Sequence, residues 1–352
     1  MRRMEKAPDS IFREVVITAI REEVEGFRTF QFVPSTGEEI RYQSGQYITL
    51  AHQGRVHEVR RSYSFTSAPV LNEPMSIGVK RIPNGSFSRL MFQLKPGDRL
   101  TTTGTGGFFT LPAQPDMPTT IFMLAAGAGI TPIFSMIKTA MASMPLVSIV
   151  LIYSSPSPAR TIFLDELRKL RENNPGRLVI EFLFSSYQLL EKARLSPLLL
   201  SQFLSAYSGN IAGPLFYLCG PEAYMRMCLF ALREARIPEP SIRKETFVIH
   251  RDDISKPAPP DQRPHHAKLR YNGREYDLLV QYPNTILETA KRMGITLPYS
   301  CETGRCGNCV ARLLSGKVWM SNNEVLTDAE IDRGLALTCT GYPIETDITL
   351  EV

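Results

Sequence analysis

Four of the six cysteines lie in the last 52 residues of this 352-residue chain, and their spacing is its strongest chemical feature. Cys301, Cys306 and Cys309 form a C-x4-C-x2-C run, and Cys339 follows after a gap of 29 residues. Four thiolates at this spacing are the ligand set of a plant-type [2Fe–2S] cluster. The two glycines inside the run supply the backbone angles and the close amide approach that such a loop needs.

Structural zinc and disulfides are the alternatives for these cysteines. Zinc sites usually combine two short pairs, whereas here only one C-x2-C pair exists and Cys339 stands alone. Disulfides require an oxidising compartment, and the start MRRMEKAPDS has no apolar stretch behind its basic residues, so no secretory signal is expected. The longest apolar stretch, residues 121–137, is too short and too interrupted for a transmembrane segment. We therefore favour the cluster and a cytoplasmic location.

The run RRSYSF offers chemistry suited to a flat, phosphorylated cofactor. Arg61 can pair with a pyrophosphate, Tyr63 can stack on a ring system, and the hydroxyl of Ser64 can bond to a ring nitrogen. Taken alone, the run is also compatible with an ordinary strand that has an exposed arginine and a half-buried tyrosine.

Residues 80–88 end a predicted strand and open a short helix. Free amides at a helix N-terminus, together with the hydroxyl of Ser88, make an anion cradle. The predicted flavin site therefore also includes Val79, Lys80 and Gly85. The alternative is that Ser86 simply caps the helix.

The run GAGITP directly follows a continuous apolar stretch, 119–126, that is typical of a strand buried on both faces. Gly127 and Gly129 let the backbone approach a phosphate, while Thr131 and Pro132 open the next helix at its positive end. Any tight strand-to-helix turn favours glycine, but this position after the first strand of a parallel sheet favours a nucleotide site.

A second strand-to-helix turn, Cys219-Gly220-Pro221, repeats this arrangement further along the chain. Its cysteine could equally be a small buried apolar residue. The chain has no Walker loop, no G-x-S-x-G elbow and no H-E-x-x-H motif.

Three kinds of element must position these residues. Short β-branched or aromatic runs fill the first ~110 residues and predict an antiparallel barrel or sandwich, interrupted by a helix over 86–94. Apolar runs at 119–126, 146–153, 177–184 and 214–220 alternate with helical patterns, which predicts βαβ units around a parallel sheet. After them, Asn272-Gly273 predicts a hairpin and TILETAKRMG predicts a capped helix.

These patterns divide the chain into domains. We expect a flavin-binding antiparallel β-barrel over 10–113, an α/β nucleotide domain over 114–250 and an α+β ferredoxin domain of β-grasp type over 267–352. A Pro-rich linker, 251–266, separates the last two. The net charge of +5 is compatible with anionic cofactors but too weak to imply nucleic acid.

In this order along the chain, the motifs resemble those of the ferredoxin–NADP reductase superfamily with a plant-type ferredoxin fused at the C-terminus. The resemblance covers residues from about 10 to 352 and is strongest to the reductase subunit of phenylacetyl-CoA epoxidase and related oxygenase reductases. It implies FAD, since the 85–88 segment resembles the pyrophosphate turn of FAD-binding members; FMN-binding relatives usually have a different glycine-rich pattern there.

The resemblance also implies roles for individual residues. It places Cys219 beside the nicotinamide and Phe247, in the run KETF, near the flavin ring. Many relatives hold the adenosine end with an Asn-Arg pair that this chain lacks, although Arg160 follows shortly after, and Arg194 matches a position that relatives use for an adenosine phosphate or ribose. Because either guanidinium could pair with a 2′-phosphate, we expect NADPH to be preferred over NADH.

The resemblance implies an NAD(P)H-dependent oxidoreductase that passes electrons through FAD and the cluster to an external oxygenase, epoxidase or desaturase component. A flavin is needed between the two because NAD(P)H delivers two electrons as hydride and a cluster accepts one. The alternatives are the same relay serving a hybrid-cluster or other redox protein, and a redox sensor subunit that does not turn over.

Overall fold

The computed structural model describes residues 11–37, 39–53, 58–83, 85–113, 115–187, 193–207, 213–247 and 257–352. These residues form two compact units. One contains residues 11–13, 102–108 and 257–352, and the other contains residues 14–101 and 109–247. Within the described part of the chain, no helix combines the length and apolarity needed to cross a lipid bilayer.

The unit that contains residues 14–101 and 109–247 begins with an antiparallel six-stranded sheet, in the order β4-β3-β6-β1-β2-β5. Its elements are β1 (Arg13–Val24), β2 (Phe27–Pro34), β3 (Tyr47–Gln53), β4 (Glu58–Ser64), the short helix η1 (Pro69–Leu71), β5 (Ser76–Lys80), α1 (Ser86–Met91) and β6 (Arg99–Gly106). An antiparallel bridge between Phe65 and Ile77 joins the two ends of this order, so the sheet closes into the predicted barrel.

The barrel's helix begins at the predicted residue, Ser86, but ends earlier than predicted. Gly85 occupies the N-cap position and Ser86 is the first helical residue, so the alternative in which Ser86 caps the helix is wrong. The helix ends at Met91, three residues early, because the next amides, of Gln93 and Leu94, donate to carbonyls three residues back and no longer four. Apolar side chains from β1 to β5 and from α1 fill the barrel interior.

Five parallel strands make the other sheet of this unit, in the order β11-β10-β7-β8-β9. The elements are β7 (Thr119–Ala126), η2 (Gly127–Gly129), α2 (Ile130–Ser143), β8 (Val147–Ser155), η3 (Pro158–Arg160), α3 (Leu164–Asn173), β9 (Leu178–Phe184), α5 (Pro197–Tyr207), β10 (Leu215–Cys219), α6 (Glu222–Glu234), η4 (Glu239–Ser241) and β11 (Ile242–Glu245). All four predicted strand runs are present, and β7 has the predicted bounds.

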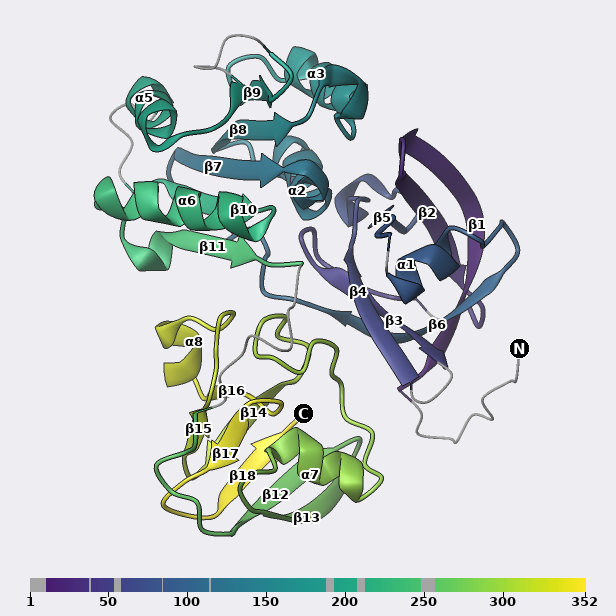
Figure 1. The fold of residues 1–352 in the computed structure, drawn as a ribbon, viewed down its shortest axis with the longest axis vertical. Coiled ribbons are helices and arrows are strands. Elements are labelled where there is room, and N and C mark those ends of the chain that lie inside the picture. The colour runs from purple at the N-terminus through teal and green to yellow at the C-terminus, as the bar shows by residue number, and fades with distance from the viewer. Residues whose placement is uncertain are drawn as a thin grey trace. The chain divides into compact units, whose positions relative to one another are not determined.

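Helices cover both faces of the parallel sheet, as Figure 1 shows. Residues of α2 and α3 pack on one face and residues of α5 and α6 on the other, and alternate residues of the same strands enter the two cores. Burial on both faces explains why these strands are continuous apolar runs rather than alternating ones.

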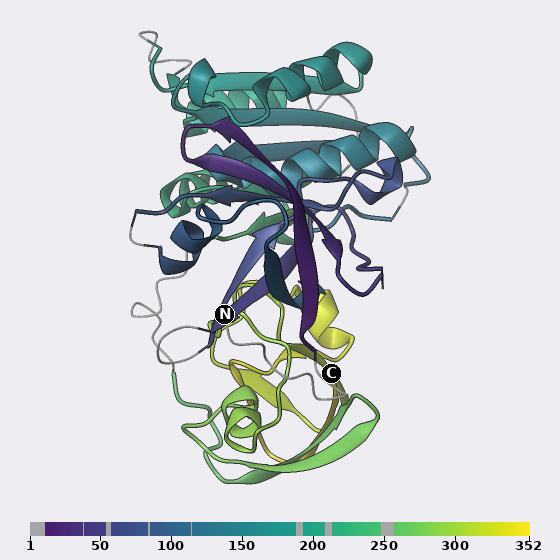
Figure 2. The same ribbon diagram turned by 90° about the vertical axis from the view of Figure 1, so that its right-hand side faces the viewer.

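A mixed five-stranded sheet of order β13-β12-β18-β14-β16 organises the other unit, beside the small β15–β17 pair. Its elements are β12 (His265–Tyr271), β13 (Arg274–Val280), α7 (Ile286–Arg292), β14 (Val310–Ser315), β15 (Val318–Met320), α8 (Asp328–Asp332), β16 (Leu335–Leu337), β17 (Gly341–Pro343) and β18 (Ile348–Glu351). The light green helix α7 lies against the sheet in Figure 2, and its buried residues join the sheet's core.

Local signals in this unit are confirmed. Asn272 and Gly273 both have positive φ, as a two-residue hairpin between β12 and β13 requires. Thr285 and Glu288 form the predicted reciprocal capping box of α7.

Strand β12 starts two residues before the predicted domain boundary at 267. His265 points inward with the alternating buried residues of the strand, and its Nε2 lies 2.9 Å from Asp261 Oδ2. The same carboxylate oxygen accepts a hydrogen bond from the Glu345 amide at 3.0 Å. The last residues of the predicted linker are therefore bonded to the ferredoxin domain, and residues 251–256 lie outside the described ones.

Candidate functional site: a cysteine loop and a flavin–nucleotide site

The four predicted cluster ligands come together. Cys301, Cys309 and Cys339 are buried and Cys306 is half-buried. The Cys301 thiol hydrogen-bonds with those of Cys306 and Cys339, and Cys339 also bonds with Cys309. The bonds from Cys306 and Cys339 hold the pKa of Cys301 well below its ordinary value. The Cys301 side chain is therefore readily a thiolate, which is the form that binds iron.

Backbone geometry explains the glycines of this loop. Gly304 and Gly307 both have φ of +76°, a conformation that side chains other than glycine rarely adopt. A Cβ on Gly304 would lie 2.4 Å from the Asn322 carbonyl oxygen. Any larger residue at position 304 would therefore clash with the Asn322 backbone. The side-chain amide of Asn322 donates to the Thr303 carbonyl at 2.7 Å, which fixes the loop from outside.

The interior of the loop fits a sulfur-rich group. The Thr303 hydroxyl and the Asn308 side-chain nitrogen are buried, and no other described group makes a hydrogen bond of ordinary geometry with them. The backbone amide of Thr303 donates to Cys301 Sγ at 3.4 Å. Donors directed at sulfur are the outer contacts that an iron–sulfur cluster needs.

The predicted flavin residues lie along β4 but on different faces. Arg61 and Tyr63 share one face because they are two residues apart, and Ser64 lies on the other. Arg61 is exposed at the surface, whereas burial raises the pKa of Tyr63, whose ring packs near Phe87 with centroids 6.0 Å apart. Tyr63 is therefore a neutral aromatic face, as stacking on a flavin requires.

Ser64 lies next to the end of the nucleotide sheet. Its hydroxyl donates to Glu245 Oε2 at 3.0 Å, although the two residues are 181 positions apart. Glu245 ends β11 and pairs in register with Cys219, which ends β10. The structure thus places the predicted pair Ser64 and Cys219 around the carboxyl group of Glu245, a residue of the KETF run to which no role was assigned from the sequence.

The electrostatics of this cluster favour neutral groups. Burial raises the pKa of Glu245 to about 8, and the hydrogen bond from Ser64 opposes that rise. Burial, with a smaller effect of Glu245, also raises the pKa of Cys219 well above its ordinary value. At neutral pH the cluster therefore contains a carboxylic acid and a thiol, not a carboxylate and a thiolate.

The second predicted flavin segment forms a tight turn before α1. The Ser88 hydroxyl accepts from the Ile82 amide at 3.1 Å and donates to the Gly85 carbonyl at 3.2 Å. Ser88 therefore braces the turn by itself, and a phosphate role for it stays a prediction. Lys80 is exposed at the end of β5 and Val79 is buried in the barrel core.

The nucleotide turn and the start of α2 are packed against two other segments. A Cβ on Gly129 would lie 2.0 Å from the Cys219 carbonyl oxygen, so the GAG and CGP turns touch through their backbones. A Cβ on Gly78 in β5 would lie 2.5 Å from Thr131 Cγ2, which brings the barrel against the start of α2. By contrast, nothing lies within 4 Å of a Cβ on Gly127, which has φ of +53°, so the turn is open on that side.

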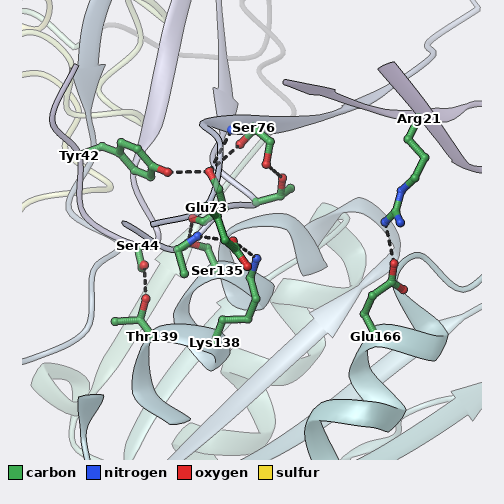
Figure 3. Close-up of polar contacts among 12 residues, drawn as sticks. Arg21, Tyr42, Ser44, Glu73, Ser76, Ser135, Lys138, Thr139 and Glu166 are labelled. Atoms are coloured by element: carbon green, nitrogen blue, oxygen red, sulfur yellow. Dashed lines mark hydrogen bonds and ion pairs between the residues drawn. The ribbon is translucent and has the colours of Figure 1, made fainter. Parts of the chain in front are cut away.

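Helix α2 is held to the barrel along its length, as Figure 3 shows. The Ser135 hydroxyl donates to the Ser67 carbonyl at 2.6 Å, and Lys138 forms an ion pair with Glu73. The Lys138 side chain is only 11% exposed, and this burial lowers its pKa despite the ion pair. The helix that begins at the nucleotide turn is therefore fixed to the domain that carries Ser64.

The remaining predicted residues lie at the surface. Arg160 ends η3 and its Nη2 lies 2.9 Å from Glu25 Oε2, with both side chains mostly exposed. Arg194 is exposed before α5, and Phe247 is 42% exposed two residues beyond β11. Gly220 and Pro221 lead from β10 into α6, with Pro221 at the N-cap.

Three contributors to the site had no role assigned to them from the sequence: Glu245, which was noted only as part of the KETF run, Gly78 and Lys138. Glu245 carried one available signal, since a carboxylate at the end of the last parallel strand lies at the ligand-binding edge of such a sheet. Gly78 and Lys138 carried none, because their partners belong to another domain.

Comparison with known families matches all three domains. Residues 14–111 match the oxidoreductase FAD-binding domain, residues 123–229 the oxidoreductase NAD-binding domain, and residues 269–343 the 2Fe-2S iron-sulfur cluster binding domain. The cofactors are therefore FAD, a pyridine nucleotide and a [2Fe–2S] cluster.

Whole-chain relatives share this organisation. The ferredoxin reductase component of 3-ketosteroid-9-alpha-monooxygenase from Mycolicibacterium smegmatis is 30% identical over 348 residues, which cover 95% of each chain. The chain belongs to this family of oxygenase reductases. Another relative, a component of the 1,2-phenylacetyl-CoA epoxidase of Escherichia coli, is 27% identical over 97% of each chain.

A solved structure of another protein shares the fold of this oxygenase reductase. Phthalate dioxygenase reductase aligns with a TM-score of 0.59 and 22% identity, over 97% of this chain and 98% of that one. This shared fold is the predicted architecture of an antiparallel flavin sheet, a parallel nucleotide sheet and a C-terminal ferredoxin domain. The whole-chain relatives and the domain matches show that the chain is a ferredoxin-reductase-type oxidoreductase.

Proposed function

We propose that the chain takes hydride from NAD(P)H at the Ser64–Cys219–Glu245 cluster and releases single electrons through the cysteine loop. The observation that carries this proposal is the hydrogen bond from Ser64 to Glu245. It brings the predicted flavin strand and the predicted nicotinamide end of the parallel sheet within direct contact. If FAD and NAD(P)H both bind beside this hydrogen bond, the flavin ring and the nicotinamide lie next to each other.

Each residue of the cluster has a task in this proposal. FAD, when bound, supplies the step from a two-electron to a one-electron carrier. Ser64 orients the reactive edge of the ring, Tyr63 supports its face, and Arg61 pairs with the diphosphate. Cys219 lines the nicotinamide side as a neutral thiol, and the protonated Glu245 adds no charge beside it.

The nucleotide side depends on backbone more than on side chains. The open side of Gly127 admits a diphosphate to the amides that begin α2, a 14-residue helix with a positive N-terminal end. Phe247, exposed just beyond Glu245, covers the flavin ring until the nicotinamide arrives. Arg160 and Arg194 bind the adenosine end of NAD(P)H.

The cysteine loop is the electron exit, through Cys301, Cys306, Cys309 and Cys339. The named relatives are components of monooxygenase and epoxidase systems. We accordingly propose an external oxygenase component as the electron acceptor, and a cytoplasmic location, where NAD(P)H is available and thiolates stay reduced.

Two electron acceptors with different entry points test the route. Ferricyanide takes electrons from the flavin directly, whereas a one-electron protein acceptor such as cytochrome c is expected to need the cluster. The purified holoprotein should contain about two irons per chain and reduce both acceptors with NAD(P)H. If ferricyanide reduction is absent although FAD is bound, or cytochrome c reduction persists without the cluster, the proposed route is wrong.

A further inference from the structure

Two buried polar side chains inside the cysteine loop lack ordinary partners. Thr303 is 5% exposed, and its hydroxyl makes no hydrogen bond of normal geometry with another described group. The side-chain nitrogen of Asn308 is equally enclosed and equally unsatisfied within the described residues. Leaving a buried donor unsatisfied is destabilising, so two in one short loop call for an acceptor that fills this loop.

The positions of these donors point to sulfur as that acceptor. Thr303 follows Cys301 by two residues, its amide donates to Cys301 Sγ at 3.4 Å, and its hydroxyl lies beside the same sulfur. Asn308 lies between Cys306 and Cys309, and its backbone amide bonds to Cys306. Both residues are therefore surrounded by cluster ligands on their own loop.

The nearby cations already have partners. Arg305 Nε lies 2.8 Å from Glu324 Oε1, and Lys291 Nζ lies 2.7 Å from Glu302 Oε2. The charges within each of these ion pairs offset each other, so they give little net compensation for an electron added to the loop. Uncharged donors close to sulfur then become the main local means of stabilising that electron.

We infer that the Thr303 hydroxyl and the Asn308 amide donate hydrogen bonds to sulfur atoms of the [2Fe–2S] centre and thereby raise its reduction potential. The two residues are positioning residues and not ligands. The inference rests on the four-cysteine cluster site, and it adds a pair of side chains that tune how readily the centre accepts an electron.

Isosteric substitutions of the full-length holoprotein test this inference. Thr303→Val keeps the side-chain shape and removes the hydroxyl, and Asn308→Leu removes the amide. In a redox titration followed by electron paramagnetic resonance, each should lower the reduced-to-oxidised ratio at a fixed potential about tenfold, which is about 59 mV for one electron. Thr303→Ser, which keeps the hydroxyl, should stay close to the wild-type potential.

Thr289→Val is the matched control. Thr289 in α7 is also buried in this domain, but its hydroxyl already donates to the Thr285 carbonyl at 2.9 Å. Its loss should leave the potential nearly unchanged. Equal potentials in wild type, Thr303→Val and Asn308→Leu, with full iron content in all three, would overturn the inference while leaving the electron route intact.

A measurement on the unaltered protein covers the case in which a variant fails to load iron. Electron–nuclear double resonance of the reduced centre in H2O and D2O should detect exchangeable protons, and selective 15N labelling of asparagine side-chain amides should give a coupling to the centre. If the wild-type centre shows no coupling to any asparagine amide, the Asn308 part of the inference is wrong. Loss of iron in the wild type would instead contradict the cluster site itself.

Discussion

The two redox sites of this protein are built in opposite ways. Three of the four cysteine ligands lie within nine consecutive residues, and one loop with two positive-φ glycines arranges them. The flavin–nucleotide cluster instead joins Ser64 on β4, Cys219 on β10 and Glu245 on β11. The first site depends on local backbone conformation and the second on how two domains pack.

This difference predicts how each site fails. A substitution in the loop should remove one cofactor and leave the other domains working, since the outside contacts that Asn322 and Cys339 make with the loop come from the ferredoxin domain itself. A substitution in the flavin–nucleotide cluster should leave the cofactors bound but slow their reaction, because the cluster controls relative placement. Single substitutions with matched controls can separate these two kinds of failure.

The largest effect is expected for Cys301→Ser. Loss of one buried thiolate should abolish the [2Fe–2S] cluster, seen as loss of iron and of its visible absorption. Ferricyanide reduction by NAD(P)H should continue, because it draws on the flavin. Cys228→Ser is the control, since this buried cysteine lies in the nucleotide domain and should leave the iron content unchanged. Loss of flavin reduction in Cys301→Ser with FAD still bound would contradict the independence of the two sites.

Ser64→Ala should slow flavin reduction roughly 100-fold, since it removes one preorganised donor at the reacting ring. Stopped-flow absorbance under anaerobic conditions measures this rate, and the cluster signal should not change. Ser62→Ala is the matched control on the same strand, where the hydroxyl pairs with Thr49 Oγ1 at 3.0 Å. Equal rates in the two variants would remove Ser64 from the reaction.

Glu245→Gln should change the pH dependence of flavin reduction. Because the pKa of Glu245 is about 8, the wild-type residue is neutral below that pH and becomes a carboxylate above it. A carboxylate beside a ring that gains negative charge opposes the reaction, so the rate should fall several-fold as pH rises through about 8. The glutamine variant should be flat over this range, and a retained pH step would assign the titration to another group.

The same pKa shift predicts a stability effect in the FAD-free protein. The folded-state pKa of about 8 lies above the ordinary value of 4.5, so the folded form binds more protons than the unfolded form between these values. The free energy of unfolding should therefore fall by up to a few kcal/mol as pH rises from about 4.5 to 8. Urea unfolding should show this slope in the wild type and less of it in Glu245→Gln.

Lys138→Met should lower the free energy of unfolding of the flavin–nucleotide unit by about 2 kcal/mol, because it leaves Glu73 without its cation at a mostly buried position. Flavin reduction should slow a few-fold as α2 loosens from the barrel, with the cluster potential unchanged. The Arg21–Glu166 ion pair offers a matched control, since Arg21 is 61% exposed and Arg21→Met should cost less than about 1 kcal/mol. Equal losses in the two variants would contradict the bracing role of Lys138.

The smallest effect concerns nucleotide preference. We expect the wild type to favour NADPH, and Glu25→Gln to raise kcat/KM for NADPH about two- to five-fold by freeing Arg160 from an exposed ion pair. Values for NADH should stay the same, and Arg160→Ala should reverse the gain. A wild-type preference for NADH that neither substitution changes would remove Arg160 from recognition.

Much of the fold follows from local patterns. The continuous apolar run 119–126 is β7 with those bounds, and the Asn272-Gly273 turn has the positive φ values that its hairpin requires. Helix α1 is shorter than its pattern suggested, since helix ends depend on capping contacts that periodicity does not report. The roles of the flavin and nucleotide residues stay predictions, whereas the three domains and their cofactors are established by the family matches.

Local patterns were enough to predict the cysteine loop, the order of the domains and the alternation of strands and helices, because each depends on residues close together in the chain. Three features follow only from the folded structure: Glu245 meets Ser64, Gly78 leaves room for Thr131, and burial keeps Glu245 protonated near neutral pH. Contacts across 181 residues and the desolvation of a carboxyl group arise from packing, and packing leaves no local pattern in a single sequence.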